Sequence, residues 1–273
     1  KDFFVGYSPE REDPSNQKYS IKNIPKICSG VTDNCSKVTQ KMYSKIVKKI
    51  VTVSNIETAE FTKIFENLYR SVNIALVNEM KTICKKLNLD IHEIISAAKT
   101  KPFGYEAFYP GPGVGGHCIP IDPFYLSWLA KKNRINLKFI ELSGKINDFI
   151  SKWIISNSLK NSNKNILLIG AAYKKNVDDP RESPVFNFID ILIKKKLNVD
   201  YHDPHIKKLE SRKLKKVFYS KKLNSKMLNK YDLIYIITDH DKINYNLIQK
   251  HGKKIVDTRN VYKKKKYKNV IKL

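Results

Sequence analysis

The sequence predicts an α/β protein, with a central helical domain followed by a doubly wound, parallel-sheet (Rossmann-like) C-terminal domain. Apolar residues recur at helical spacing through the middle of the chain. Beyond residue 163, short apolar strands alternate with helical stretches, the pattern of a parallel sheet covered by helices. With 273 residues, 41% of them hydrophobic, the chain is long enough for two modest cores.

The N-terminal segment contains two short candidate strands, Phe3 to Tyr7 and Ile24 to Ser29. Between them, Ser8 to Asn16 is polar and rich in turn-forming residues. The chain begins at Lys1 without Met, almost directly in an apolar run. We therefore expect residues 1–53 to be the end of an earlier domain and the sequence to be incomplete at its N-terminus.

Residues 54–160 are expected to form the helical domain. Asp90 precedes one of its helices and can serve as the N-cap. Residues 101–123 interrupt the helices with five Pro and five Gly, which predicts an ordered loop or a flexible linker. The expected helices run over Glu57 to Leu87, Ile91 to Ala98, Pro123 to Lys132 and Phe139 to Leu159.

Residues 161–273 are expected to form the α/β domain, after a short polar linker at 160–163. A helix is predicted from Pro184 to Lys195. The expected strands are continuous apolar runs, as in a parallel sheet buried on both faces. They run over Ile166 to Ile169, Val199 to His202, Leu233 to Ile237, and Ile255 to Val256.

The formal net charge of +26 suggests a nucleic acid or an anionic membrane surface as partner. Only six of the 52 basic residues are Arg, however, and the Lys are scattered along the chain. Because Arg is the better phosphate ligand, we expect no nucleic-acid partner. No stretch reaches the ~20 apolar residues of a membrane span, so no membrane partner is expected either.

Four cysteines lack the spacing of a metal site or a disulfide framework, which is consistent with a reducing, cytoplasmic location. One of them, Cys118, follows the loop PGPGVGG and His117. Glycines let the backbone approach a ligand, and a Cys beside exposed N–H donors is suited to attack a carbonyl. Gly111, Gly113 and Gly116 match GxGxxG formally, but no strand precedes them, so we expect no dinucleotide fingerprint here.

Several motifs in order resemble the UDP-glucose/GDP-mannose dehydrogenase family. They are SPEREDP (8–14), TAEFTKIFEN (58–67), GPGVGGHCIPIDP (111–123), GAAYKKNVDDPRESP (170–184), YHDP (201–204) and VDTRN (256–260). The resemblance covers nearly the whole chain. It implies oxidation of the C6 primary alcohol of a nucleotide sugar to a carboxylate, with two NAD reduced per sugar, for synthesis of surface polysaccharide precursors.

The resemblance assigns Cys118 as the nucleophile that attacks the C6 aldehyde and then carries a thioester. It implies that Glu10 is the general base in thioester hydrolysis. Lys63 and Asn67 match residues at the reacting oxygen, and their spacing of four places them on one helix face. Asp122 matches a carboxylate that positions water, although it could instead cap the helix that follows.

The resemblance also implies a set of binding residues. Arg181, in the RES motif, is expected to reach the NAD cofactor; because a cation is unfavourable near a helix N-terminus, we expect an anion to pair with it. The central helices are expected to form a homodimer or a higher homo-oligomer. Residues expected to bind the UDP-sugar substrate are Tyr109, Gly111, Gly113, Gly115, Tyr173, Lys174 and Arg259.

Three questions remain open at this point. SPEREDP and HCIPIDP, with Ile121 where several UDP-glucose enzymes carry Lys, favour a UDP-N-acetylhexosamine, with UDP-N-acetylglucosamine as first choice. Because no segment supplies the family's NAD-binding motif, the chain by itself is expected to bind a UDP-sugar without reducing NAD. The alternatives are a truncated, inactive protein that binds a nucleotide sugar and a basic nucleic-acid-binding α/β protein.

Overall fold

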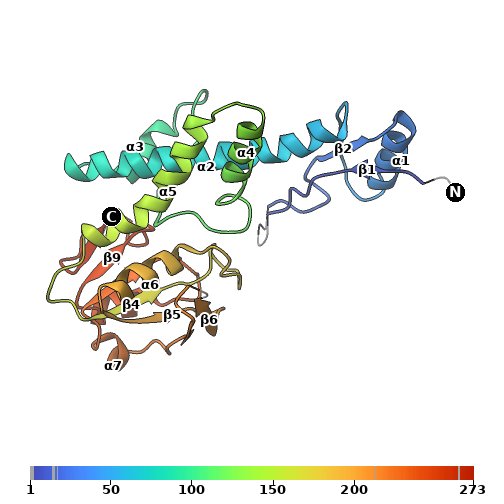
Figure 1. Cartoon of the computed structure of the whole chain (residues 1–273). Helices are drawn as coiled ribbons and strands as arrows, with labels where there is room; N and C mark the ends of the chain where they lie inside the picture. The colour runs from blue at the N-terminus through green and yellow to red at the C-terminus, as the bar shows by residue number, and fades with distance from the viewer. Residues whose placement is uncertain (1–2, 14–15, 17, 212, 264) are drawn as a thin grey trace. The chain divides into compact units, whose positions relative to one another are not determined.

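The computed structural model describes residues 3–13, 16, 18–211, 213–263 and 265–273 (Figure 1). The chain forms two compact units, residues 1–69 and 70–273, and each is described by itself. Two residues of the expected turn region lie outside the described residues: Pro14, which ends the SPEREDP motif, and Ser15. The predicted division into three domains at residues 53 and 160 stays a prediction.

The first unit contains a small sheet. Strand β1 (Gly6–Tyr7) pairs antiparallel with β2 (Lys26–Gly30), which pairs parallel with β3 (Ile50–Thr52). Helix α1 (Asp33–Tyr43) connects β2 to β3, and the Thr32 hydroxyl caps it by accepting a hydrogen bond from the Cys35 N–H at 3.2 Å. Both predicted strands are confirmed; α1 and β3 were not predicted.

Helix α2 (Ile56–Lys86) is the longest element and contains the division between the two units. The Asn55 side chain accepts a hydrogen bond from the Thr58 N–H at 2.7 Å near its start. Glu57 lies in its first turn and two lysines in its last, as the helix dipole favours. Helix α3 (Ile91–Ala98) follows, and Asp90 caps it through the His92 N–H at 2.9 Å. Both helices and the predicted cap are confirmed.

In the second unit, α4 (Asp122–Lys132) packs on α5 (Lys138–Ser156). A Cβ at Gly144 would lie 2.6 Å from the Phe124 ring, so only glycine permits this close approach. Asn147 of α5 receives a hydrogen bond from Asn78 (3.2 Å) and donates one to the Ser71 carbonyl (3.0 Å). These buried polar contacts join α2 to α5 within the second unit.

The C-terminal part of the second unit is a five-stranded parallel sheet in the order β10-β9-β8-β4-β5. Helices α5 and α6 (Pro184–Lys194) cover one face, and α7 (Ser225–Leu228) and α8 (Tyr245–His251) cover the other (Figure 1). The predicted doubly wound sheet is therefore confirmed. Its strands are β4 (Asn165–Ile169), β5 (Asn198–His202), β8 (Leu233–Ile236), β9 (Ile255–Asp257) and β10 (Val270–Lys272).

The sheet alternates its apolar side chains between two cores. Leu168 and Tyr235 face one core, while Leu167 and Ile234 face the other, and all four are fully buried. Each such burial stabilises the fold by about 1.5–3 kcal/mol. A short antiparallel hairpin, β6 (Lys208–Ser211) and β7 (Lys216–Tyr219), was not predicted. Among the described residues, no helix combines the length and the apolar character that a membrane crossing requires.

Candidate nucleotide-sugar site

The glycine loop begins with a firmly held end at Gly111 and Pro112, both buried. The Asn78 side chain of α2 accepts a hydrogen bond from the Gly111 N–H at 3.0 Å. The Ser151 hydroxyl of α5 donates to the Pro112 carbonyl at 2.5 Å. Neighbouring Ile150 and Ile154 of α5 belong to the core of the C-terminal sheet. Helix α5 therefore positions this end of the loop relative to the sheet.

The middle of the loop packs against the segment that follows β4. A Cβ at Gly115 would lie 2.8 Å from the Tyr173 Cβ, and one at Gly116 would lie 3.1 Å from the Tyr173 ring. Gly116 also has a positive φ of 87° and donates its N–H to the Arg181 carbonyl at 3.0 Å. The structure thus brings together the predicted Gly115, Tyr173 and Arg181.

Cys118 ends the loop in a turn that leads into α4. Its carbonyl accepts hydrogen bonds from the Ile121 N–H (3.0 Å) and the Asp122 N–H (2.9 Å). Its thiol is exposed, whereas the other three cysteines are buried. The Arg181 guanidinium lies within electrostatic range of this thiol. Cys118 is therefore the exposed thiol among the four cysteines, near a cation and beside a glycine-rich backbone.

Arg181 has an acidic partner, Asp179. The Arg181 Nε lies 2.9 Å and its Nη2 2.6 Å from Asp179 Oδ2. This hydrogen-bonded pair lowers the pKa of Asp179 and raises that of Arg181. The expectation of an anionic partner is confirmed. The cofactor contact that the resemblance implies for Arg181 stays a prediction.

Arg259 reaches the other end of the loop. A Cβ at Gly111 would lie 2.7 Å from Arg259 Nη1, so the missing side chain makes room for the guanidinium. The Arg259 Nε donates to the Ile237 carbonyl at 2.7 Å. Burial lowers the pKa of Arg259. The predicted binding residues Gly111 and Arg259 therefore lie side by side.

Tyr173 and Lys174 follow the carboxyl end of β4, where open parallel sheets bind ligands. The turn before them depends on Gly170, whose φ is 84° and whose Cβ would lie 2.2 Å from the Thr238 carbonyl oxygen. The buried Asp203 carboxylate accepts hydrogen bonds from the Ala171 N–H (2.6 Å) and the Ala172 N–H (3.2 Å). This carboxylate shapes the turn that carries Tyr173.

The buried His240 is the second partner of Asp203. Its Nε2 lies 2.9 Å from Asp203 Oδ2, and its Nδ1 accepts the Asn176 N–H at 2.9 Å. Accepting at Nδ1 leaves the proton on Nε2, so a neutral imidazole donates to the carboxylate. Burial alone would raise the pKa of Asp203, but the hydrogen bonds from His240 and the backbone lower it to about 2. Sequence reasoning missed both roles; the signal available was the acid in YHDP directly after a strand.

In the first unit, Glu10 lies beside Lys26, with 2.8 Å between its Oε2 and the lysine Nζ. Despite partial burial, this contact lowers the pKa of Glu10. Arg11 pairs with Glu66 of α2 at 2.6 Å and holds the SPER segment against that helix. Glu66 lies between Lys63 and Asn67 in sequence, and Asn67 is buried. The approach of Glu10, Lys63 and Asn67 to Cys118 stays a prediction.

The alternative role of Asp122 as a helix cap is wrong. Ile121 occupies the N-cap position, no side chain caps α4, and Asp122 is already the first helical residue. Its α-helical backbone prevents the extended cap geometry in which a side chain reaches back to the second or third N–H. The water-positioning role of Asp122 stays a prediction.

Tyr109 and Gly113 complete the predicted binding set. The exposed Tyr109 ring stacks on His92 of α3, with ring centroids 6.2 Å apart. Gly113 has a φ of 140°, and a Cβ there would lie 3.4 Å from Pro184. Both belong to the same loop as Cys118. Their contact with a substrate stays a prediction.

The dinucleotide cofactor of the family does not fit the described residues on their own. The formal GxGxxG match at 111–116 follows α3 and a loop, not a strand, as predicted. The described parts of the chain show no other glycine pattern of this spacing between a strand and a helix. They also contain no group of His, Cys, Asp and Glu that could hold a metal ion.

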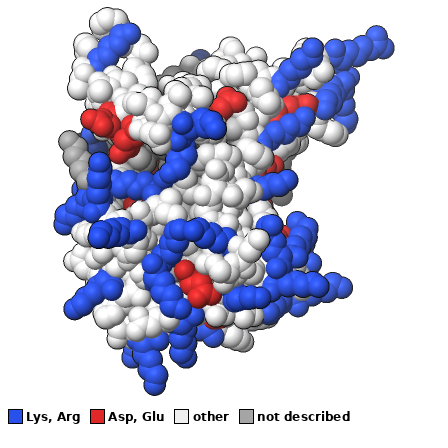
Figure 2. Space-filling view, turned by 90° about the vertical axis from the view of Figure 1, so that its left-hand side faces the viewer, with Lys and Arg blue, Asp and Glu red and all other residues white. Residues whose placement is uncertain are grey.

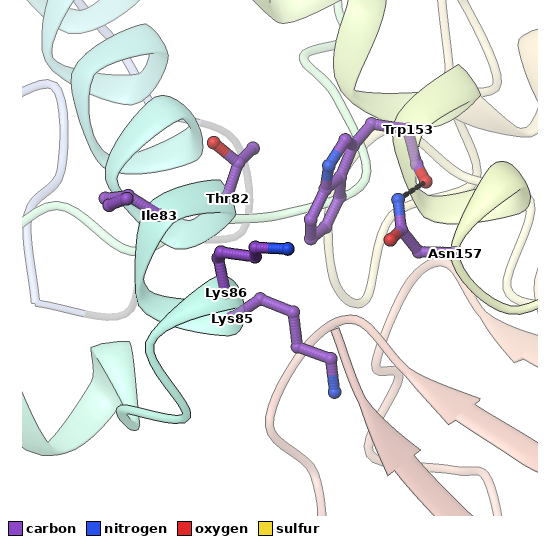
Figure 3. Close-up of a pocket in the computed structure, with 6 residues that line it drawn as sticks. All are labelled: Thr82, Ile83, Lys85, Lys86, Trp153 and Asn157. Carbon is purple, nitrogen blue, oxygen red and sulfur yellow. Dashed lines mark hydrogen bonds between the residues drawn. The ribbon is translucent and has the colours of Figure 1, made fainter.

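Away from the loop, an open hollow of about 460 Å³ lies between α2 and α5 (Figure 3). None of the predicted site residues lines it. The hollow is lined by Thr82, Ile83, Lys85, Lys86, Trp153 and Asn157. On the face in Figure 2, Lys and Arg side chains are scattered rather than gathered in one stripe. This distribution gives no support to a nucleic-acid groove.

Comparison with known proteins defines the class. Residues 57–149 match the central domain of the UDP-glucose/GDP-mannose dehydrogenase family, and residues 167–264 match its UDP binding domain. The chain belongs to this family, as the motifs indicated.

Individual relatives are similar over most of this chain. A UDP-N-acetyl-D-mannosamine dehydrogenase from Methanococcus vannielii is 33% identical over 96% of the chain and 61% of its own length. A UDP-N-acetyl-D-glucosamine 6-dehydrogenase from Pseudomonas aeruginosa is 33% identical over 76% of the chain and 50% of its own length. The structure of a UDP-D-ManNAc dehydrogenase from Pyrococcus horikoshii superposes with a TM-score of 0.83 at 29% identity, over 99% of this chain and 65% of that one. The chain thus spans between half and two thirds of these relatives.

Proposed function

We propose that this chain carries the thiol nucleophile and the UDP-sugar site of an NAD-dependent nucleotide-sugar 6-dehydrogenase. The observation that carries the proposal is the exposed Cys118 at the end of a glycine loop that contacts α2, α5 and the turn after β4. That turn lies at the carboxyl end of a strand in the part of the chain that matches a UDP binding domain. One loop thus connects the nucleophile with the nucleotide-binding sheet.

In the proposed reaction, NAD accepts the hydrides when it is bound. The Cys118 sulfur adds to the carbonyl carbon of the C6 aldehyde and forms a thiohemiacetal. After oxidation to the thioester, water attacks the acyl carbon and releases the carboxylate and the free thiol. The Arg181 guanidinium lies within electrostatic range of this sulfur. The roles of Glu10, Lys63, Asn67 and Asp122 in these steps rest on the motifs alone.

The proposed substrate is a UDP-N-acetylhexosamine, with UDP-N-acetylglucosamine as first choice. Two relatives with the same identity to this chain are named for different sugars, one for N-acetylglucosamine and the other for N-acetylmannosamine. Their names support an N-acetylated sugar more strongly than they support either epimer of it. The product would be the uronic acid of a surface polysaccharide precursor. The proposed binding set is unchanged, with Tyr109, Tyr173 and Lys174 joining the loop glycines and Arg259.

We also propose a homo-oligomer formed through the central helices. Within the second unit, Leu76, Met80 and Ile83 are exposed on α2, and Trp128 on α4. Apolar surface of this kind on helices is typical of an interface. Analytical ultracentrifugation tests this point, and a monomer at micromolar concentration would contradict it.

The function is tested with the product of the complete reading frame. It should form uronate and NADH from UDP-N-acetylglucosamine with a kcat/KM about tenfold or more above that for UDP-glucose, because a pocket built for the acetamido group is left unsatisfied by a hydroxyl. UDP-N-acetylmannosamine is the third substrate of the assay. Binding of UDP-sugars without NADH formation would favour the alternative, an inactive nucleotide-sugar-binding protein.

A further inference from the structure

Lys81 of α2 is buried without a partner. It is only 4% exposed, and its Nζ has no hydrogen-bond partner in the described part of the chain. Burying an unpaired ammonium group is costly, and such groups are normally paired or neutral. Neither the motifs nor the proposed reaction uses this residue. The position therefore needs a ligand or another physical reason.

The helix face that carries Lys81 is the face that holds the glycine loop. Ser71, Asn78 and Lys81 are buried polar residues at intervals of seven and three, so they share one face of α2. Asn78, one turn before Lys81, accepts the Gly111 N–H. Gly111 in turn makes room for Arg259. Lys81 lies within electrostatic range of Arg259, so both cations belong to the Gly111 end of the loop.

Two cations at this end of the loop, Lys81 and Arg259, have no acidic hydrogen-bond partner among the described residues. Lys81 lies within electrostatic range of Arg259 and Asp257, and neighbouring His92 of α3 within range of Lys81, Asp257 and Lys272 of β10. Asp257 is already occupied, because its carboxylate accepts the N–H groups of Arg259, Val261 and Tyr262 at 3.0–3.1 Å. Asp239 also lies within range of Arg259, and Asp90 within range of His92, but no ion pair joins an acidic side chain to Lys81 or Arg259 among the described residues.

We propose that Lys81 and Arg259, together with the Gly111 end of the loop, bind the diphosphate group of a nucleotide ligand. The assignment of that ligand as a UDP-sugar rests on the proposed function; the anion site itself does not. A diphosphate can accept hydrogen bonds from both Lys81 and Arg259, the two cations that lack an acidic partner among the described residues. Charge-assisted hydrogen bonds to phosphate would satisfy the Lys81 ammonium group.

Protonation of Lys81 should make anion binding at this site depend on pH. Burial and then the Arg259 cation lower the pKa of Lys81 to about 7, while Asp257 opposes the shift. His92, whose pKa is lowered by burial, is neutral at this pH. A bound phosphate anion restores the Lys81 ammonium group, so binding takes up protons near pH 7 and weakens as the pH rises above it.

The experiment titrates the 273-residue chain with inorganic pyrophosphate, UDP and uridine by calorimetry near pH 7, in two buffers of different ionisation enthalpy. Lys81→Met is compared with Lys85→Met, the same change one turn further along α2 at an exposed position. Lys81→Met should weaken pyrophosphate and UDP binding about tenfold or more and abolish the proton uptake. Uridine binding and all values for Lys85→Met should match the wild type.

Thermal unfolding without ligand separates this role from a structural one. Removing a buried, unpaired charge should leave the Tm of Lys81→Met equal to or above that of the wild type. Equal pyrophosphate affinity in wild type and Lys81→Met, or no pyrophosphate binding by the folded wild type, overturns the anion site. Lys81-dependent binding of pyrophosphate with no binding of UDP or UDP-sugars upholds the anion site and contradicts the proposed function.

Discussion

The two ends of the glycine loop differ in burial and in charge. At Gly111 the backbone is buried and held by Asn78, and two cations, Lys81 and Arg259, lack an acidic side-chain partner among the described residues. At Cys118 the thiol is exposed, and the nearby cation, Arg181, is already paired with Asp179. A buried cation without an ion-pair partner is suited to bind an anion. An exposed thiol beside an arginine that is already paired with an aspartate is suited to react with a substrate. In the proposed function, the Gly111 end of the loop would anchor the ligand and the Cys118 end would react with it.

The largest expected effect is at the reactive end. In the product of the complete reading frame, Cys118→Ser should lower uronate formation by several orders of magnitude, because a hydroxyl replaces the nucleophile that forms the thioester. UDP-sugar affinity and Tm should stay near wild type, since the side chain is exposed. Cys84→Ser is the control: this buried site should lose about 1–2 kcal/mol of stability and keep its activity. Near-normal acid formation by Cys118→Ser would remove Cys118 from the mechanism.

Asp203 should be the main support of the turn that packs on the reactive end. Its pKa is lowered from 3.8 to about 2, so its charge contributes roughly 2 kcal/mol of stability. That contribution is complete above pH 4 and disappears as the pH falls through about 2. Asp203→Asn should lose about 2–3 kcal/mol at neutral pH and remove this part of the acid dependence. Denaturant unfolding from pH 2 to pH 7 tests it, and an unchanged pH profile in Asp203→Asn would contradict the assignment.

Replacing a glycine by alanine should have different effects at the two ends of the loop. Gly116→Ala should cost about 1–2 kcal/mol, because its φ of 87° is unfavourable for alanine and the Tyr173 ring is 3.1 Å away. Gly111→Ala should cost less, since its Cβ meets only the flexible end of Arg259 at 2.7 Å. Its effect should be several-fold weaker pyrophosphate binding. If Gly111→Ala proves the more destabilising of the two, the Gly111 end is more rigid than its contacts indicate.

The smallest effect is expected for Arg181→Gln. The side chain is 65% exposed, so solvent screens both its pair with Asp179 and its field at Cys118. Alkylation of Cys118 by iodoacetamide should slow about twofold, and Tm should hardly change. Lys175→Gln, which breaks an exposed pair with Asp241, is the matched control and should leave the alkylation rate unchanged. A rate equal to wild type in Arg181→Gln would show that the cation does not act on the thiol.

Local sequence patterns were sufficient to predict the longer helices and strands and the anionic partner of Arg181. The apolar spacing of α2, the Asp90 cap of α3 and the apolar runs of β4 and β8 are properties of neighbouring residues, so the sequence predicted them. The anion beside Arg181 was expected from its place at a helix start, and Asp179 is two residues away. Short elements such as β6 and β7 were missed, because four residues carry too little periodicity.

By itself, the sequence determined the family, the doubly wound C-terminal sheet and the position of Cys118 at the end of a glycine loop, because these depend on ordered motifs and local spacing. Only the tertiary structure decided that Lys81 is buried with no hydrogen-bond partner among the described residues, that Arg259 lies against Gly111, and that Asp203 and His240 support the turn after β4. It also decided that Asp122 begins α4 without capping it. The physical reason is that burial and contact arise between residues far apart in the chain, such as Gly111 and Arg259, and chain order alone does not specify which side chains meet.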